Sequence, residues 1–130
     1  MAIRTILYVD DDADDHDLFS QIVYSIDPDI KLIHANDSCQ IDDYLKEPLP
    51  DIIILDMNMP RMDGLECLKR IRADNTFKKI PIVMYSVVNY KANEAYELGA
   101  NYFMIKHSTL DDIKEDIKHL LNRSWNNDNT

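Results

Sequence analysis

Three short apolar runs in this chain each stop at a charged residue, and this pattern limits the possible folds more than any other feature. The runs and the residues that end them are 6–9 with Asp10, 52–55 with Asp56, and 103–105 with Lys106. Short runs of this kind, rich in apolar side chains, are typical of buried strands. When such strands are parallel, their carboxyl ends lie at one edge of the sheet, where α/β proteins place their chemistry. The sequence therefore predicts that two carboxylates and an ammonium group, far apart in the chain, meet at this edge.

Between these runs, apolar residues recur at the spacing of an amphipathic helix. Strands are predicted at residues 5–9, 30–35, 52–56, 82–85 and 102–105. Helices are predicted at residues 14–26, around 41–45, from 63, at 90–98 and from 109. The third strand is the most apolar and is predicted to be central, whereas the second alternates with polar residues and suits a sheet edge. The alternation of strand and helix predicts a doubly wound α/β fold, with a five-stranded parallel sheet covered on both faces.

Length, charge and cysteine content narrow the class of protein. The 130 residues predict one domain over residues 1–122, followed by a polar tail at 123–130 that frays. The net charge of −10 argues against direct binding of nucleic acid, and no apolar stretch approaches a membrane span or a signal region. Cys39 and Cys67 lack the spacing of a disulfide framework or a zinc site. We therefore expect a cytoplasmic protein that binds neither membrane nor nucleic acid.

The acidic residues at the predicted sheet edge suit a divalent metal. Asp10 and Asp11 follow the first strand and Asp56 ends the third, so their carboxylates would repel one another without a cation. Mg²⁺, or Mn²⁺ in its place, prefers oxygen ligands of this kind and keeps several waters. Asn58 lies two residues beyond Asp56 and is placed to add its backbone carbonyl. We predict a metal site formed by Asp10, Asp11, Asp56 and Asn58.

Asp56 is also suited to attack a phosphoryl group. A carboxylate held at a rigid strand end can form an acyl phosphate. Lys106 would bind a phosphoryl oxygen as a point charge, and Ser86, at the end of the fourth strand, would hydrogen-bond another. Such a transfer depends on positioning and on neutralising charge. Asp56, Ser86 and Lys106 are therefore the predicted catalytic residues.

Several other polar and sulfur-containing residues are expected to have structural roles only. Aspartates at the start of the first helix are interpreted as solvated charges that suit the helix dipole; they are Asp12, Asp14, Asp15 and Asp17. The histidines expected at the surface, and not as ligands, are His16, His34 and His119. Asp63 is interpreted as a helix cap. The methionines expected to pack at the rim of the site are Met57, Met59 and Met62.

Four strings of residues, one near each of four strand ends, resemble those of a known family. They are residues 6–12, 56–64, 81–86 and 99–106. Together they resemble the response-regulator receiver domain, the chemotaxis-regulator-like module of two-component signalling, over residues 4 to about 122. The resemblance implies a flavodoxin-like fold with the strand order 2-1-3-4-5. It also implies a single-domain response regulator that signals through a protein–protein surface on its fourth helix, fifth strand and fifth helix.

The resemblance implies a role for each site residue. Asp56 would accept a phosphoryl group from a phosphohistidine of a histidine kinase or a histidine phosphotransfer protein. Asp11 would bind Mg²⁺ directly, Asp10 through water and Asn58 through its carbonyl. The remaining roles are a switch hydroxyl for Ser86, a switch aromatic for Phe103 and phosphoryl binding for Lys106. The protein would catalyse only its own phosphorylation and dephosphorylation, remain a monomer or weak dimer, and pass its signal to a downstream protein target.

Two positions depart from the family pattern. Lys106 is followed by His107, where the family usually has a proline, and Ser86 is followed by Val87, where the family usually has a small residue. A cis bond before a non-proline residue costs about 3–4 kcal/mol, so the bond between Lys106 and His107 is predicted to be trans. A re-aimed loop, together with a Val87 side chain pointing at the site, predicts slow gain and slow loss of the phosphoryl group.

Other classes of protein fit the sequence less well. A flavin-binding protein of this topology would need an uncharged loop, rich in glycine and hydroxyl groups, where Asp10 and Asp11 stand. A phosphatase with an aspartyl nucleophile would need a second acid in place of Asn58, and a nucleotide hydrolase would need a glycine-rich phosphate loop. The main alternative is a receiver used as a binding module without phosphorylation. Asp10, Asp11, Asp56, Ser86 and Lys106 speak against it, whereas Val87 and His107 leave it open.

Overall fold

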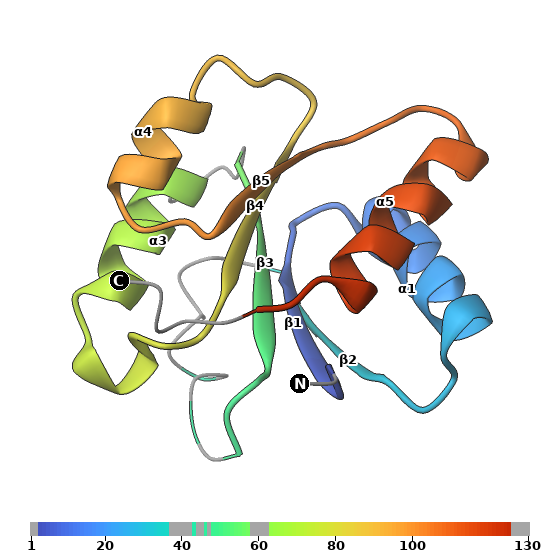
Figure 1. Ribbon diagram of the computed structural model, residues 1–130, viewed down its shortest axis with the longest axis horizontal. Helices are drawn as coiled ribbons and strands as arrows, with labels where there is room; N and C mark the ends of the chain where they lie inside the picture. The colour runs from blue at the N-terminus through green and yellow to red at the C-terminus, as the bar shows by residue number, and fades with distance from the viewer. Residues whose placement is uncertain (1–2, 37–42, 44–45, 47, 58–62, 126–130) are drawn as a thin grey trace.

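The computed structural model describes residues 3–36, 43, 46, 48–57 and 63–125 of the chain. Its five strands form one parallel sheet in the order β2-β1-β3-β4-β5 (Figure 1). The strands are β1 (Thr5–Val9), β2 (Lys31–Ala35), β3 (Ile52–Asp56), β4 (Ile82–Ser86) and β5 (Tyr102–Ile105). This order confirms the predicted fold class, with β3 at the centre and β2 at an edge.

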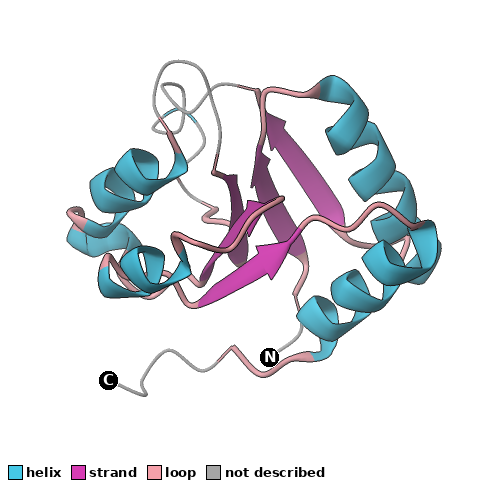
Figure 2. Cartoon of the chain, turned by 90° about the horizontal axis from the view of Figure 1, so that it is seen from above, coloured by secondary structure: helices cyan, strands magenta, loops and turns pink. Residues whose placement is uncertain are grey.

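Helices cover both faces of the sheet. The helices are α1 (Ala13–Ile26), α3 (Gly64–Arg72), α4 (Ala92–Glu97) and α5 (Leu110–Asn122), with a 3₁₀ turn, η2 (Asn75–Phe77). Figure 2 shows α1 and α5 on one side of the sheet and α3 and α4 on the other. No helix in the described ranges is long and apolar enough to cross a membrane. The helix predicted around residues 41–45 falls almost wholly outside the described residues.

Alternation along the strands creates two cores. In β1, Leu7 packs in the cluster beneath α3 and α4, while its neighbours Ile6 and Tyr8 pack in the cluster beneath α1 and α5. All five residues of β3 are buried, as expected for a central strand that is covered on both faces. Each buried branched side chain contributes roughly 1.5–3 kcal/mol to folding. The sheet edge that bears the charged residues is therefore held by a rigid apolar base.

Helix α4 is shorter than predicted. It spans Ala92–Glu97 instead of residues 90–98. Lys91 precedes it without a capping side-chain bond, and Tyr90 is 77% exposed, so neither capping nor burial extends the helix. At its other end Gly99 has φ of +111°, a conformation that favours glycine and closes the helix as predicted.

The start of the C-terminal tail is packed against the domain. The indole N–H of Trp125 donates to the carbonyl of Leu120 at 2.8 Å, and the Arg123 guanidinium lies over the rings of Tyr102 and Trp125. The prediction of a frayed tail is therefore wrong for Arg123 and Trp125, because an aromatic side chain can bury area that the surrounding polar residues cannot. The domain boundary at residue 122 remains a prediction.

Candidate functional site

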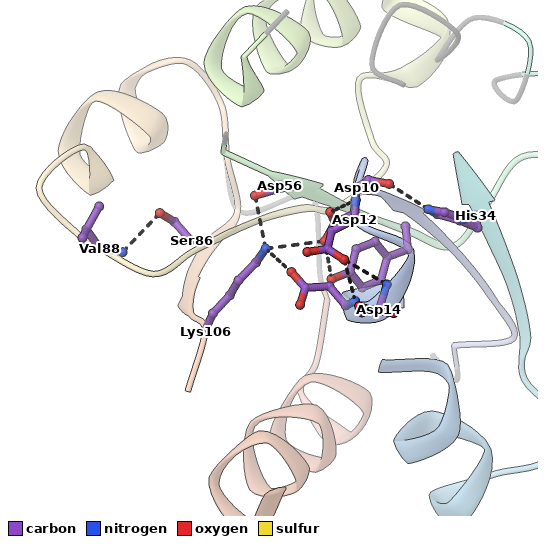
Figure 3. A network of polar contacts seen from close by, with 10 residues as sticks. Asp10, Asp12, Asp14, His34, Asp56, Ser86, Val88 and Lys106 are labelled. Atoms are coloured by element: carbon purple, nitrogen blue, oxygen red, sulfur yellow. Dashed lines mark hydrogen bonds and ion pairs between the residues drawn. The ribbon is translucent and has the colours of Figure 1, made fainter. Parts of the chain in front are cut away.

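The strand ends bring the predicted charged residues together. Asp56 ends β3 and Asp10 follows β1, which pairs with β3, while Lys106 follows β5 at the same sheet edge (Figure 3). In the described part of the chain, the polar or charged residues that are buried are Asp10, Asp56 and Ser86. All three lie at this edge. Burial of polar groups is unfavourable unless they are paired, so their concentration at one place marks a functional site.

Tight packing behind Asp56 holds that carboxylate in place. Helix α3 begins at Gly64, whose N–H donates to the carbonyl of Met57 at 2.9 Å. A Cβ atom on Gly64 would lie 2.6 Å from the carbonyl oxygen of Asp56, so only glycine allows this close approach. Asp63 caps the helix by accepting from the N–H of Glu66, as predicted. Met57 is buried as expected, whereas Met59 and Met62 lie outside the described residues.

Three carboxylates at this edge can bind a divalent metal. Asp10, Asp11 and Asp56 can each offer one oxygen, and these oxygens lie within 4.8 Å of one another. Asp10 and Asp56 are buried, and Asp11 is exposed. A set of hard oxygen donors with one open, solvated side suits Mg²⁺ or Mn²⁺. Asn58, the fourth predicted ligand, lies outside the described residues.

Lys106 supplies the one positive charge found among these carboxylates in the described chain. Its Nζ lies 3.5 Å from Asp10, 3.3 Å from Asp56 and 3.1 Å from Asp15. Burial alone would lower the pKa of Lys106, but Asp10, Asp56 and Asp15 more than offset burial and raise it above its usual value. The ammonium group therefore stays protonated at physiological pH. One such charge does not neutralise these three carboxylates together with Asp11, which groups with Asp10 and Asp56, and this leaves the site attractive to a cation.

Asp10 is held from several sides. The hydroxyl of Tyr8 donates to its Oδ2 at 2.9 Å, and the N–H of Asp12 donates to its Oδ1 at 2.9 Å. Burial, and then the charge of Asp10, raise the pKa of Tyr8 far above its usual value, so the phenol stays protonated and donates. The backbone N–H of Asp10 donates to the carbonyl of Ala35, and the backbone carbonyl of Asp10 lies 2.7 Å from Nε2 of His34. Contacts with the protein itself thus fix Asp10, one of the three grouped carboxylates.

The positions of two histidines were predicted incorrectly. His16 and His34 stack with ring centroids 3.9 Å apart and planes 17° apart, and both are partly buried. They pair because α1 covers β2 next to Asp10. Burial, and then His34, lower the pKa of His16, whose Nε2 is buried and has no hydrogen-bond partner among the described residues. Neither belongs to the carboxylate group, and His119 is exposed as expected.

The structure also corrects the role expected for Asp15. Asp12 caps α1, with its side chain accepting from the N–H groups of Asp14 and Asp15, as its helix-start position suggested. Asp15, however, is not a freely solvated charge, because it makes the shortest ion pair with Lys106. The sequence gives one indication of this contact. Asp15 stands three positions after the cap residue Asp12, and residues so spaced lie on the same side of a helix start, which here faces the sheet edge.

The predicted switch residues lie beside the site. The Ser86 hydroxyl accepts from the N–H of Val88 at 3.2 Å. The backbone carbonyl of Ser86 accepts from the backbone N–H of Lys106 at 2.7 Å. Phe103 is half-buried against the core beneath α3 and α4, and its N–H donates to the Tyr96 hydroxyl at 3.0 Å. Val87 is 62% exposed, so its side chain is not packed into the site. The expected effect of Val87 on access to Asp56 remains a prediction.

Comparison with known proteins shows the family. The sequence profile of the response regulator receiver domain matches residues 6–118, and the chain belongs to this family of two-component signalling modules. It is 40% identical over 72 residues to the chemotaxis protein CheY1 of Helicobacter pylori, which covers 54% of this chain and 58% of CheY1. It is 29% identical over 119 residues to the response regulator Rcp1 of Synechocystis, covering 85% of this chain and 81% of Rcp1.

A larger relative and a solved structure extend this picture. The chain is 36% identical over 131 residues to a protein-glutamate methylesterase/protein-glutamine glutaminase of Methanosarcina mazei, covering 95% of this chain but 35% of that protein. Among the curated relatives named here, it thus spans about a third of one and less than two thirds of CheY1. The crystal structure of the Mn²⁺-bound form of response regulator Rcp1 matches with a TM-score of 0.80 and 27% identity, over 93% of this chain and 96% of that one.

Proposed function

We propose that this chain is a response-regulator receiver in which Asp56 accepts a phosphoryl group from a phosphohistidine. The observation that carries the proposal is the buried carboxylate of Asp56, 3.3 Å from the Lys106 ammonium and grouped with Asp10 and Asp11. A nucleophile, a cation for the phosphoryl oxygens and a metal-binding carboxylate group thus stand at one sheet edge. These are the features that transfer of a phosphoryl group to a carboxylate requires.

In the proposed reaction, a carboxylate oxygen of Asp56 attacks phosphorus in line with the bond to the donor imidazole. The new O–P bond forms as the N–P bond breaks, and the imidazole leaves with the electron pair and takes up a proton. Lys106 binds an equatorial oxygen, and the Ser86 hydroxyl donates to another. Asp10, Asp11 and Asp56, with the carbonyl of Asn58, would hold a Mg²⁺ or Mn²⁺ ion, which when bound neutralises charge on the transferring group.

Signal output follows from the same contacts. Movement of Ser86 and Lys106 toward the phosphoryl group would change the end of β4 and the loop after β5, and Phe103 would turn inward. The adjoining surface of α4, β5 and the start of α5 exposes several large side chains, which suits a protein partner. These are Tyr90, Tyr96 and Leu110, exposed by 77%, 45% and 61%. We propose that this surface binds the downstream target.

The remaining features complete the proposal. The phosphodonor is a histidine kinase or a histidine phosphotransfer protein. The protein has no catalytic activity beyond its own phosphorylation and dephosphorylation, is a monomer or weak dimer, and acts in the cytoplasm. Neither nucleic acid nor membrane is a direct partner, because the net charge is −10.

Incubation with a small phosphodonor and Mg²⁺, followed by intact mass and peptide mapping, tests this function. We expect one phosphoryl group on Asp56, no gain when the metal is chelated, and no gain in Asp56→Asn, since an amide is a poor nucleophile. Modification of another residue in Asp56→Asn would refute the assignment. An unmodified parent protein would favour a binding module that works without phosphorylation.

A further inference from the structure

The ammonium group of Lys106 is fully occupied by carboxylates. It has three N–H donors, and three acids lie within reach: Asp10 at 3.5 Å, Asp56 at 3.3 Å and Asp15 at 3.1 Å (Figure 3). Of these, the contact with Asp15 is also a hydrogen bond of ordinary length, at 3.1 Å. Lys106 therefore has to leave one of these acids before it can donate to a phosphoryl oxygen.

The three acids are not equivalent in the presence of a metal. Asp10 and Asp56 belong to the carboxylate group that can bind a divalent cation, and a bound cation takes up their charge. Asp10 also accepts from Tyr8 through the same Oδ2 that faces Lys106. Asp15 lies on α1, outside that group. A metal bound at Asp10, Asp11 and Asp56 would therefore not take up the charge of Asp15, which would still be paired with Lys106. Metal binding thus weakens two of the three contacts and leaves the third.

The position of Asp15 allows this contact to break. Its side chain is 41% exposed, whereas Asp56 is 7% and Asp10 is 0% exposed. Asp15 and Lys106 also line a pocket between α1 and α5, together with Tyr85 and Ile113. A partly exposed carboxylate beside open space can turn to water with little loss. A buried one cannot, because it would lose its partners without gaining solvent.

We propose that Asp15 is a positioning residue that holds Lys106 in the unphosphorylated protein and competes with the phosphoryl group for its ammonium. The proposal rests on the proposed function, because it requires Lys106 to bind a phosphoryl oxygen at Asp56. Exchange of Asp15 for that oxygen is then part of the phosphorylation step.

Replacement of Asp15 by asparagine should speed phosphorylation. Asp15→Asn keeps the shape of the side chain but removes its charge, and we expect the rate with a small phosphodonor at saturating Mg²⁺ to rise about two- to fivefold, the range for a partly exposed ion pair. Asp14→Asn is the matched control. It removes the same charge from the same exposed helix turn, and the carboxylates in contact with Lys106 in the described chain do not include Asp14.

A double-mutant cycle separates this role from a general effect of charge. In a Lys106→Gln background, Asp15→Asn should leave the slow residual rate unchanged, because the contact it relieves no longer exists. The affinity for a beryllium fluoride mimic of the phosphoryl group should rise in Asp15→Asn by the same two- to fivefold factor. Thermal unfolding of each variant shows that the fold is intact.

The possible outcomes distinguish this inference from the proposed function. Equal rates in Asp15→Asn and Asp14→Asn would overturn the inference, as would a slower Asp15→Asn, which would mean that Asp15 aligns Lys106 for the reaction. An effect of the same size in the Lys106→Gln background would also overturn it. A parent protein that gains no phosphoryl group at Asp56 would overturn the proposed function itself, and the inference with it.

Discussion

The two ends of the sheet carry partly buried cations in opposite environments. At the carboxyl end, Lys106 lies among charged carboxylates. At the amino end, Arg72 of α3 donates to uncharged oxygens: the carbonyls of Gly99, Phe77 and Lys78, and the side-chain oxygen of Asn101. Asn101 in turn accepts from the N–H of Ile82 at the start of β4. Lys106 thus contacts several carboxylates that repel one another, whereas Arg72 contacts uncharged oxygens.

This difference separates function from stability. The guanidinium of Arg72 fits its acceptors and joins α3 to the start of β4 and the end of α4, so it stabilises one state. The carboxylates at the other end repel one another, and Lys106 offsets that repulsion only in part, so an added cation would stabilise them further. Strain of this kind is expected where a protein must respond to a ligand.

The largest effect on stability is expected at the amino end. Arg72→Ala should lower the free energy of unfolding by about 2–4 kcal/mol, because several partly buried acceptors lose a charged donor together. Urea unfolding measures this change. Lys69→Ala, an exposed site on the same helix, is the control and should be nearly neutral. A loss from Arg72→Ala no larger than that from Lys69→Ala would show that this end contributes no such fixed network.

Alkaline pH should destabilise the face of the sheet beneath α1 and α5. Burial raises the pKa of Tyr85 to about 12, from an ordinary value near 10, and also raises that of Tyr8. A raised folded-state pKa means that the folded protein binds the phenolic proton more tightly than the unfolded one. This stability is complete below pH 10 and is lost as the pH rises through 10 toward 12; for Tyr85 it amounts to about 3 kcal/mol.

The test is the free energy of unfolding as a function of pH. Tyr85→Phe should flatten the decline between pH 10 and 12, whereas Tyr90→Phe, at a 77% exposed position, should leave the decline as it is. A decline that is the same in the parent and in Tyr85→Phe would contradict this origin.

A smaller loss is expected when Asp10 loses a donor. Tyr8→Phe removes the hydroxyl that donates to Asp10 at 2.9 Å, and should lower metal-free stability by about 1–2 kcal/mol. A bound metal compensates for the lost donor, so the deficit should shrink when Mg²⁺ is added. Chemical unfolding with chelator and with Mg²⁺ measures both values. An equal deficit in the two conditions would mean that Tyr8 stabilises the core without acting on the metal site.

The sequence predicts a structural feature well where residues close together in the chain determine that feature. Strands β1, β3 and β5 have the predicted bounds, since each is a short apolar run with polar residues at its ends. The grouping of Asp10, Asp56 and Lys106 also follows from sequence, because parallel strands place their carboxyl ends together. The ends of α4 do not follow from the sequence, because neither a capping side chain nor a stripe of buried residues defines them.

Contacts between elements were harder to predict. The stacking of His16 on His34 depends on how α1 crosses β2, and no periodicity in either segment encodes that. The bond from Tyr8 to Asp10 requires the tyrosine ring to end beside a carboxylate two residues later, which an ideal strand pattern places on the same face but not at hydrogen-bond distance. Asp15 was interpreted by its helix position alone, and its partner Lys106 lies 91 residues away.

The dependence of stability on Mg²⁺ tests most directly the claim that the carboxylates at the carboxyl end, already paired with Lys106, favour a further cation. At a Mg²⁺ concentration ten times its dissociation constant, the parent protein should gain about 1.4 kcal/mol, with a corresponding rise in melting temperature. Asp11→Ala should respond less to Mg²⁺ and, with one carboxylate fewer at the site, should be more stable than the parent when metal is absent. A parent protein whose melting temperature does not change with Mg²⁺, or an Asp11→Ala variant that is less stable than the parent without metal, would contradict the claim.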